Sequence, residues 1–137
     1  MEPEIRHPDK ADEFFTGERC FILESSNTAE DPAVSIARAR VAPGVTTAWH
    51  RLDGVVERYL LVEGRGRVEV GELPPEEVGP GDVVRIPAGV RQRITNLGEG
   101  DLVFYAICSP RFEPDCYVDL EGSGASGSSW RDEGGGT

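Results

Sequence analysis

The sequence predicts an all-β protein built as a single domain, and two observations support this fold class. From Val34 onward, short segments alternate apolar and polar residues with a period of two, which is typical of strands with one buried face. Gly and Pro residues separate these segments, and no segment repeats its apolar residues at the 3.6-residue period of a long helix. Many short strands joined by regular turns indicate a sandwich or a barrel.

The segments divide the 137 residues into an arm, a barrel and a tail. Residues 1–32 form a polar N-terminal arm that is partly strand, because residues 14–25 read FFTGERCFILES and offer apolar surface. Residues 33–120 form the barrel, with strands expected in VSIARARV, VERYLLVEG, GRVEVGE, VVRIPAG, VRQRITNLG and DLVFYAICS. Residues 121–137 are rich in Gly and Ser and are predicted to be a disordered tail, since they bury too little apolar surface to offset the entropy of ordering.

The composition limits the classes of partner. The net charge is −11, and Lys10 is the only lysine among 14 basic residues. Nucleic-acid binders usually carry a basic face, so we expect no nucleic-acid partner. No segment approaches the ~18 apolar residues that span a bilayer, and the charged N-terminus lacks the apolar stretch of a secretory signal, so we expect a cytoplasmic protein without a membrane partner. The acidic, lysine-poor surface suits a high-salt cell or reflects genome composition.

Two motifs with regular spacing lie within the expected barrel. The first has intervals of six, two, five and seven positions between its residues, which are Gly44, His50, Leu52, Glu57 and Gly64. The second has intervals of six, two, three and four positions between its residues, which are Gly81, Pro87, Gly89, Gln92 and Asn96. The glycines and the proline are explained by turns between strands, whereas the polar side chains call for a functional explanation.

These motifs make the chain resemble the cupin superfamily, and within it the small single-domain conserved-barrel proteins of the cupin 2 type. The cupin patterns are G-x5-H-x-H-x(3,4)-E-x6-G and G-x5-P-x-G-x2-H-x3-N, and every spacing of this sequence fits them. The resemblance covers about residues 34–120 and implies the cupin double-stranded β-helix, a jelly-roll barrel, preceded by the N-terminal arm. It implies the fold rather than one reaction, because the same barrel carries many chemistries.

The resemblance also implies four metal-ligand positions, of which two are changed here. They correspond to His50, Leu52, Glu57 and Gln92, where the family pattern has three His and one Glu. Leu52 cannot ligate a metal, and the neutral amide oxygen of Gln92 is a weak ligand for transition metals. We therefore expect at most a weak or atypical site for a divalent ion such as Fe, Mn, Zn or Ni, held by His50, Glu57 and Gln92.

Residues two apart on a strand point to one face, which predicts further pocket residues. Leu52 shares the face of His50, and Tyr59 shares the face of Glu57, where its hydroxyl orients a ligand or its ring packs in the core. Arg38 and Arg40 also share a face. They either enter the pocket and bind an anionic substrate by bidentate hydrogen bonds, or form a solvated or subunit-facing pair.

The sequence leaves three functions open for the pocket centred on His50, Glu57 and Gln92. One is an enzyme that uses a divalent ion to act on a small polar or anionic molecule. Another is a metal-free enzyme in which His50 and Glu57 act as general acid and base. The third is a cupin that only binds a small-molecule ligand, as a sensor or binding module. The apolar arm is also compatible with a homodimer.

Overall fold

The structure is a computed structural model that describes residues 1–122. The predicted tail, residues 121–137, lies almost wholly outside the described residues. Two short 3-10 helices, η1 (Lys10–Asp12) and η2 (Pro114–Cys116), accompany the strands. The strands are β1 (Phe14–Phe15), β2 (Phe21–Ser26), β3 (Ser35–Val41), β4 (His50–Leu52), β5 (Val56–Glu63), β6 (Gly66–Val70), β7 (Glu76–Val78), β8 (Val83–Ile86), β9 (Gln92–Asn96), β10 (Leu102–Ser109) and β11 (Tyr117–Asp119).

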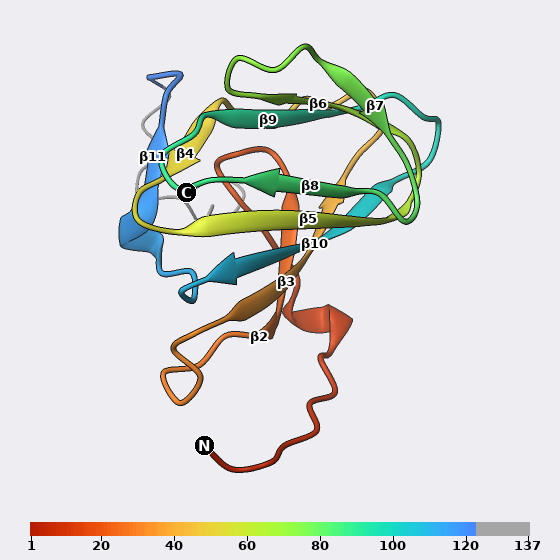
Figure 1. The fold of residues 1–137 in the computed structure, drawn as a ribbon. Coiled ribbons are helices and arrows are strands. Elements are labelled where there is room, and N and C mark those ends of the chain that lie inside the picture. The colour runs from red at the N-terminus through yellow and green to blue at the C-terminus, as the bar shows by residue number, and fades with distance from the viewer. Residues whose placement is uncertain (123–137) are drawn as a thin grey trace.

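The strands form two facing antiparallel sheets, so the all-β prediction is confirmed (Figure 1). The larger sheet has the order β1-β2-β3-β10-β5-β8, and the smaller sheet has the order β11-β4-β9-β6-β7. This double-sheet arrangement is that of a jelly roll. Within residues 1–122, no helix has the length and apolar character needed to cross a membrane.

The N-terminal arm extends the larger sheet rather than lying apart from it. Strand β2 of the arm pairs antiparallel with β3 of the barrel, with Phe21 opposite Arg40 and Leu23 opposite Arg38. Strand β1 pairs in turn with β2 and forms the edge of the sheet. Residues before η1 leave the body of the molecule as an extended segment (Figure 1). The arm is therefore partly strand, and its strands cover one edge of the barrel.

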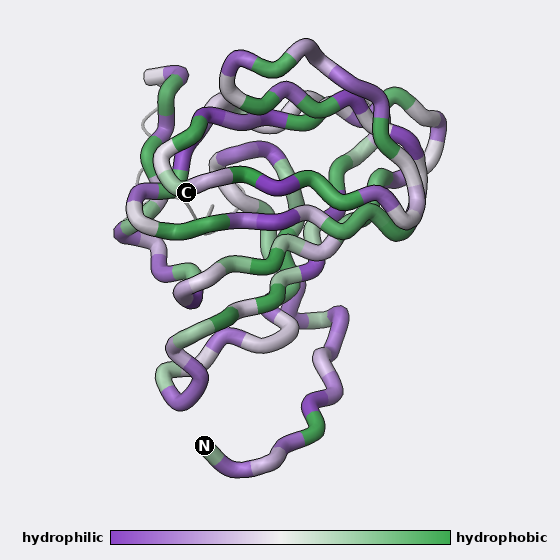
Figure 2. The backbone as a smooth tube through the Cα atoms, in the orientation of Figure 1, coloured by the Kyte–Doolittle hydropathy of each residue, from purple (hydrophilic) through white to green (hydrophobic). Residues whose placement is uncertain are grey.

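Alternation of apolar and polar residues places the core between the sheets. Figure 2 shows this alternation along the strands. On β10, Phe104, Ala106 and Cys108 are buried at every second position, as expected for a strand with one face against the core. The largest fully buried apolar side chains come from both sheets and are Leu61, Ile86, Ile94 and Leu102.

The last glycine of the first motif has a structural role. Gly64 follows β5 with a φ of 87°, a left-handed conformation that favours glycine. A Cβ atom at Gly64 would lie 2.7 Å from the backbone oxygen of Asp101, which leaves no room for a side chain. The turn after β5 therefore requires glycine, and this motif position needs no catalytic explanation.

Candidate functional site

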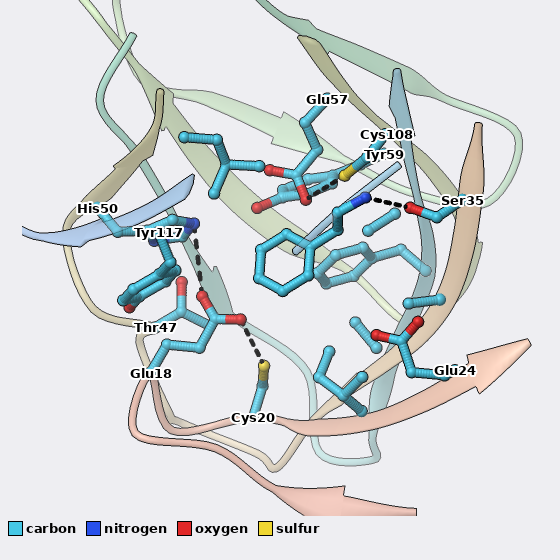
Figure 3. Close-up of a pocket in the computed structure, with 17 residues that line it drawn as sticks. Glu18, Cys20, Glu24, Ser35, Thr47, His50, Glu57, Tyr59, Cys108 and Tyr117 are labelled. Carbon is cyan, nitrogen blue, oxygen red and sulfur yellow. Dashed lines mark hydrogen bonds and ion pairs between the residues drawn. The ribbon is translucent and has the colours of Figure 1, made fainter. Parts of the chain in front are cut away.

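A small cavity between the two sheets receives three side chains of the first motif, those of His50, Leu52 and Glu57 (Figure 3). Strands β2, β3, β5 and β10 of the larger sheet and β4 and β11 of the smaller sheet supply its walls. The space open to the centre of a water molecule is about 40 Å³. A single water needs roughly 10–15 Å³ by this measure, so the cavity has room for a few waters or one small chemical group.

His50 lies at the start of β4 and directs Nε2 into the cavity. Its Nδ1 is 2.7 Å from the backbone oxygen of Ala48, and a carbonyl oxygen only accepts, so Nδ1 carries a proton. Its Nε2 is 3.4 Å from Oε2 of Glu18 (Figure 3). The ring stacks on Tyr117 with the centroids 5.0 Å apart. The imidazole is therefore fixed in orientation and in tautomer.

Glu57 is a buried carboxyl group on β5, only 8% exposed. Its Oε1 accepts a hydrogen bond of 2.7 Å from Nε2 of Gln92, and Oε2 lies 3.8 Å from Sγ of Cys108. Burial raises the pKa of Glu57 to about 7, since desolvation disfavours the charged form. The charge of His50 opposes this shift, while the carboxylate of Glu18 adds to it. Near neutral pH, Glu57 is therefore present in both protonation states.

Gln92 lies behind the cavity wall rather than in it. Its side chain is fully buried, its Nε2 donates to Glu57, and its Oε1 accepts a hydrogen bond from the hydroxyl of Tyr59. The oxygen and the nitrogen of the amide thus both form hydrogen bonds within the protein. Gln92 does not line the cavity, whereas Tyr59 and Leu52 do. Its evident role is to hold the carboxyl group of Glu57 and the hydroxyl of Tyr59 in place.

The residues do not fit a divalent metal as they are placed. Leu52 contributes an apolar wall where a ligand is usual in the family pattern, and the amide of Gln92 already bonds to Tyr59 and Glu57. Among residues 1–122, no group of three or more His, Cys, Asp or Glu side chains is arranged so that it can hold a metal ion. A metal could therefore be held by His50, Glu57 and Gln92 only after these side chains rearrange.

Arg38 and Arg40 do not line the cavity, so of the two alternatives for this pair the one in which they enter the pocket and bind an anionic substrate is wrong. The smaller Ala37 and Ala39 occupy the inward positions of β3 and line the cavity. The arginines point to the opposite face, where Arg38 lies 3.6 Å and Arg40 2.6 Å from the carboxylate of Glu13. A period of two fixes which residues share a face, but the sizes of the neighbours decide which face turns inward.

Glu18 belongs to the cavity although its place in the arm gave no such indication. It lies in the turn between β1 and β2, where its Oε2 faces His50 and its Oε1 is 3.3 Å from Sγ of Cys20. The side chains of Glu18, Cys20, Ile22 and Glu24 all line the cavity. A spacing of two positions is typical of one strand face, but only Ile22 and Glu24 lie on β2, so this spacing alone does not place Glu18 in the cavity.

The Cupin domain family matches residues 37–108, which is more than half of the chain. The chain belongs to the cupin family. This match confirms the resemblance to cupins that the two motifs indicated, and with it the expected jelly-roll fold. The arm that carries Glu18 lies outside the matched residues of this cupin. No curated protein matches the sequence.

Solved structures similar to this cupin include KdgF from Halomonas sp., with a TM-score of 0.69 and 19% identity over 80% of this chain and 96% of that one. A cupin 2 conserved barrel domain protein from Salinispora arenicola has a TM-score of 0.66 and 22% identity over 80% and 90% of the two chains. Oxalate decarboxylase from Bacillus subtilis has a TM-score of 0.74 and 18% identity over 88% of this chain, which spans only 33% of that protein. At these identities the similarity shows the fold.

Proposed function

We propose that this cupin is an enzyme that performs general acid–base chemistry on a small polar molecule, with Glu57 and His50 as the groups that transfer protons. The proposal is best supported by the placement of Glu57, a buried carboxyl group that lines the cavity and accepts a hydrogen bond from Gln92, where burial raises its pKa to about 7. A catalytic acid or base is most effective when its pKa lies near the working pH. His50 adds a second group that exchanges a proton at Nε2, on the side of the cavity where Glu18 lies.

Residues in the cavity wall and behind it position these two groups and the ligand. Gln92 donates to Oε1 of Glu57, and the other oxygen, Oε2, has only the weak contact with Sγ of Cys108 at 3.8 Å, so it can also accept a proton of the substrate. The backbone oxygen of Ala48 fixes the tautomer of His50, so that Nε2 is the nitrogen that gains and loses a proton. Leu52 and Tyr59 provide apolar contact surface for the body of the ligand.

A divalent ion remains a lesser proposal for the same residues. It needs the amide of Gln92 to release Tyr59 and turn its oxygen toward the cavity, or else a ligand set completed by water. When bound, such an ion would supply Lewis-acid polarisation of a substrate oxygen. The acid–base proposal needs neither this rearrangement nor the ion.

Proton exchange with solvent tests the acid–base proposal even though the substrate is not identified. We would incubate small molecules that carry acidic C–H groups with the protein in D2O and follow deuterium incorporation and conversion by NMR. The Glu57→Gln variant keeps the hydrogen bond to Gln92 and should lose about 10²-fold or more in rate. Glu63→Gln, an exposed position on the same strand, is the matched control and should leave the rate unchanged.

Two results of this experiment would contradict the proposal. A molecule that binds but is recovered unchanged and undeuterated would favour the ligand-binding function over the enzyme. A rate that rises when Fe, Mn, Zn or Ni salts are added, and falls on chelation, would favour the metal site.

A further inference from the structure

The wall of the cavity reaches the surface of the protein on the side away from His50. Most side chains that line the cavity are buried, but four are partly exposed, and three of these, Glu24, Ala37 and Phe112, lie together. Glu24 lies opposite Ala37 in the pairing of β2 with β3. The backbone nitrogen of Phe112 donates to Ser35, which lies two positions before Ala37. Figure 3 shows Glu24 and Ser35 on the side of the cavity opposite His50. Glu24, Ala37 and Phe112 therefore form the mouth of the cavity.

The fourth partly exposed residue, Glu18, lies on a side that backbone hydrogen bonds close. The backbone nitrogen of Thr16 donates to the oxygen of Cys20, and the backbone nitrogen of Ala48 donates to the oxygen of Glu18. These bonds fix the turn to the barrel without the help of a side chain. A molecule that enters at the mouth instead passes Phe112 on its way to the proton-transferring groups.

The backbone of Phe112 is held by side chains rather than by a sheet. Phe112 lies in the loop between β10 and η2, where its nitrogen donates to Oγ of Ser35 at 2.8 Å. Its oxygen accepts a bond of 2.8 Å from Nδ2 of Asn27, and Oδ1 of Asn27 accepts one of 2.9 Å from Nε of Arg111. A loop held by a few contacts opens with less free energy than the strands of a sheet. Phe112 is therefore on the part of the wall that moves most easily.

We propose that Phe112 determines by size which molecules reach Glu57 and His50, because its ring closes the mouth and moves with its loop. With the ring in place, about 40 Å³ of the cavity is open to the centre of a water molecule, enough for a few non-hydrogen atoms. A larger molecule enters only when the loop carries the ring outward. This inference rests on the proposed function in treating the cavity as a substrate pocket.

The thiol of Cys108 makes entry measurable without a known substrate. Cys108 is buried and lines the cavity, and its Sγ lies 3.8 Å from Oε2 of Glu57. Labelling of this thiol by a mercurial therefore reports arrival beside Glu57. Methylmercury chloride and phenylmercury acetate form the same Hg–S bond but differ in size. We would follow initial rates by peptide mass spectrometry with the full chain, in a Cys116→Ser background that removes the half-buried thiol of the loop.

Two variants change the mouth in different ways. Phe112→Ala should raise the labelling rate with phenylmercury at least about tenfold and the rate with methylmercury by less, because the missing ring obstructs the larger probe more. Asn27→Ala keeps the ring and every lining side chain but removes the bond to the loop, so both rates should rise about fivefold. Phe15→Ala is the control, since it removes a half-buried ring that does not line the cavity, and it should change neither rate.

Three outcomes would overturn the inference: no acceleration in Phe112→Ala, equal acceleration of both probes in that variant, or an acceleration as large in Phe15→Ala, which would mean that labelling proceeds through general unfolding. Melting curves establish that each variant is folded. If Phe112→Ala does not fold, Asn27→Ala decides, because unchanged rates there contradict a movable loop.

The acid–base proposal fails separately, since labelling of Cys108 requires no proton transfer by Glu57 or His50. Filtering by size without deuterium exchange in any compound contradicts the enzyme and leaves the role of Phe112 standing. Deuterium exchange together with unfiltered entry contradicts the role of Phe112 and leaves the enzyme standing.

Discussion

At the scale of single residues, Glu57 carries a carboxyl group that folding removes almost completely from water. Its carboxyl group is buried, accepts a hydrogen bond from Gln92 and lies close to the thiol of Cys108. The loss of solvent raises the pKa of Glu57 to about 7. The unfolded chain releases the same proton near the ordinary value of 4.5. Since the folded state binds the proton more tightly, Glu57 makes the stability of the protein depend on pH.

We predict that the free energy of unfolding falls as the pH rises from 4.5 to about 7. In this range the folded state holds a proton that the unfolded state has lost, so the stabilising contribution is complete below 4.5 and is lost above about 7. The full change is on the order of 3 kcal/mol. The pKa values of Glu13 and Glu69 are lowered by their arginine partners, so these groups titrate below this range.

Denaturant unfolding at a series of pH values measures this effect, with Glu57→Gln as the comparison. The variant keeps the shape and the bond to Gln92 but has no proton to lose, so its stability should be nearly constant across the same range. A wild-type curve that rises or stays level between these pH values would contradict the raised pKa.

At the scale of elements, the turn between β1 and β2 places Glu18 in the cavity. The hydroxyl of Thr16 donates to the backbone oxygen of Cys20 at 2.9 Å, and the backbone nitrogen of Arg19 donates to the oxygen of Thr16. Arg19 has a φ of 73°, an uncommon conformation for a residue with a side chain. The turn is fastened to the barrel where the backbone nitrogen of Ala48 donates to the oxygen of Glu18. Glu18 is therefore held by backbone contacts on both sides.

We expect Thr16→Val to destabilise the protein by about 1 kcal/mol, because it removes a buried hydrogen bond without changing the shape of the side chain. Thr16 is fully buried, so no water replaces the lost contact. Denaturant unfolding gives the change, and the half-buried Thr28→Val serves as the control. An unchanged midpoint would mean that the turn does not depend on this hydroxyl.

At the scale of the whole molecule, strands β5 and β8 expose three large apolar side chains at one end of the larger sheet. Leu60 is 36%, Val62 42% and Val83 63% exposed, and Leu60 lies opposite Val83 in the pairing of β5 with β8. The homodimer expected from the sequence remains a prediction, and this face is the surface that we assign to it.

Light scattering after gel filtration measures the molar mass and so checks the dimer. Wild-type protein should have twice the chain mass, and Val83→Glu should shift it toward the monomer, because a charge at an apolar interface is left unpaired. Leu120→Glu, a partly exposed position on neither β5 nor β8, should leave the mass unchanged. Monomeric wild-type protein would contradict the prediction.

The sequence was sufficient for the fold because glycine spacing and period-two alternation are local signals. The spacing of two placed His50 with Leu52 and Glu57 with Tyr59 on shared strand faces, and the resemblance to cupins implied that both faces line one cavity, as they do. The sequence did not reveal that the amide of Gln92 forms hydrogen bonds with Tyr59 and Glu57. These bonds depend on the distance between strands β5 and β9, which lie in different sheets. Glu18 could not be found in this way, since its contact with His50 depends on a turn that folds back from the arm.

The position of Glu18 and Glu24 in the arm has a consequence for comparisons between such proteins. The barrel that carries His50 and Glu57 matches the family, while the segment that carries Glu18 and Glu24 precedes the matched region. The pocket is therefore assembled from two stretches of the chain, and Glu18 of the first contacts His50 of the second. A comparison confined to residues 37–108 leaves out the part of the cavity wall that the N-terminal segment supplies.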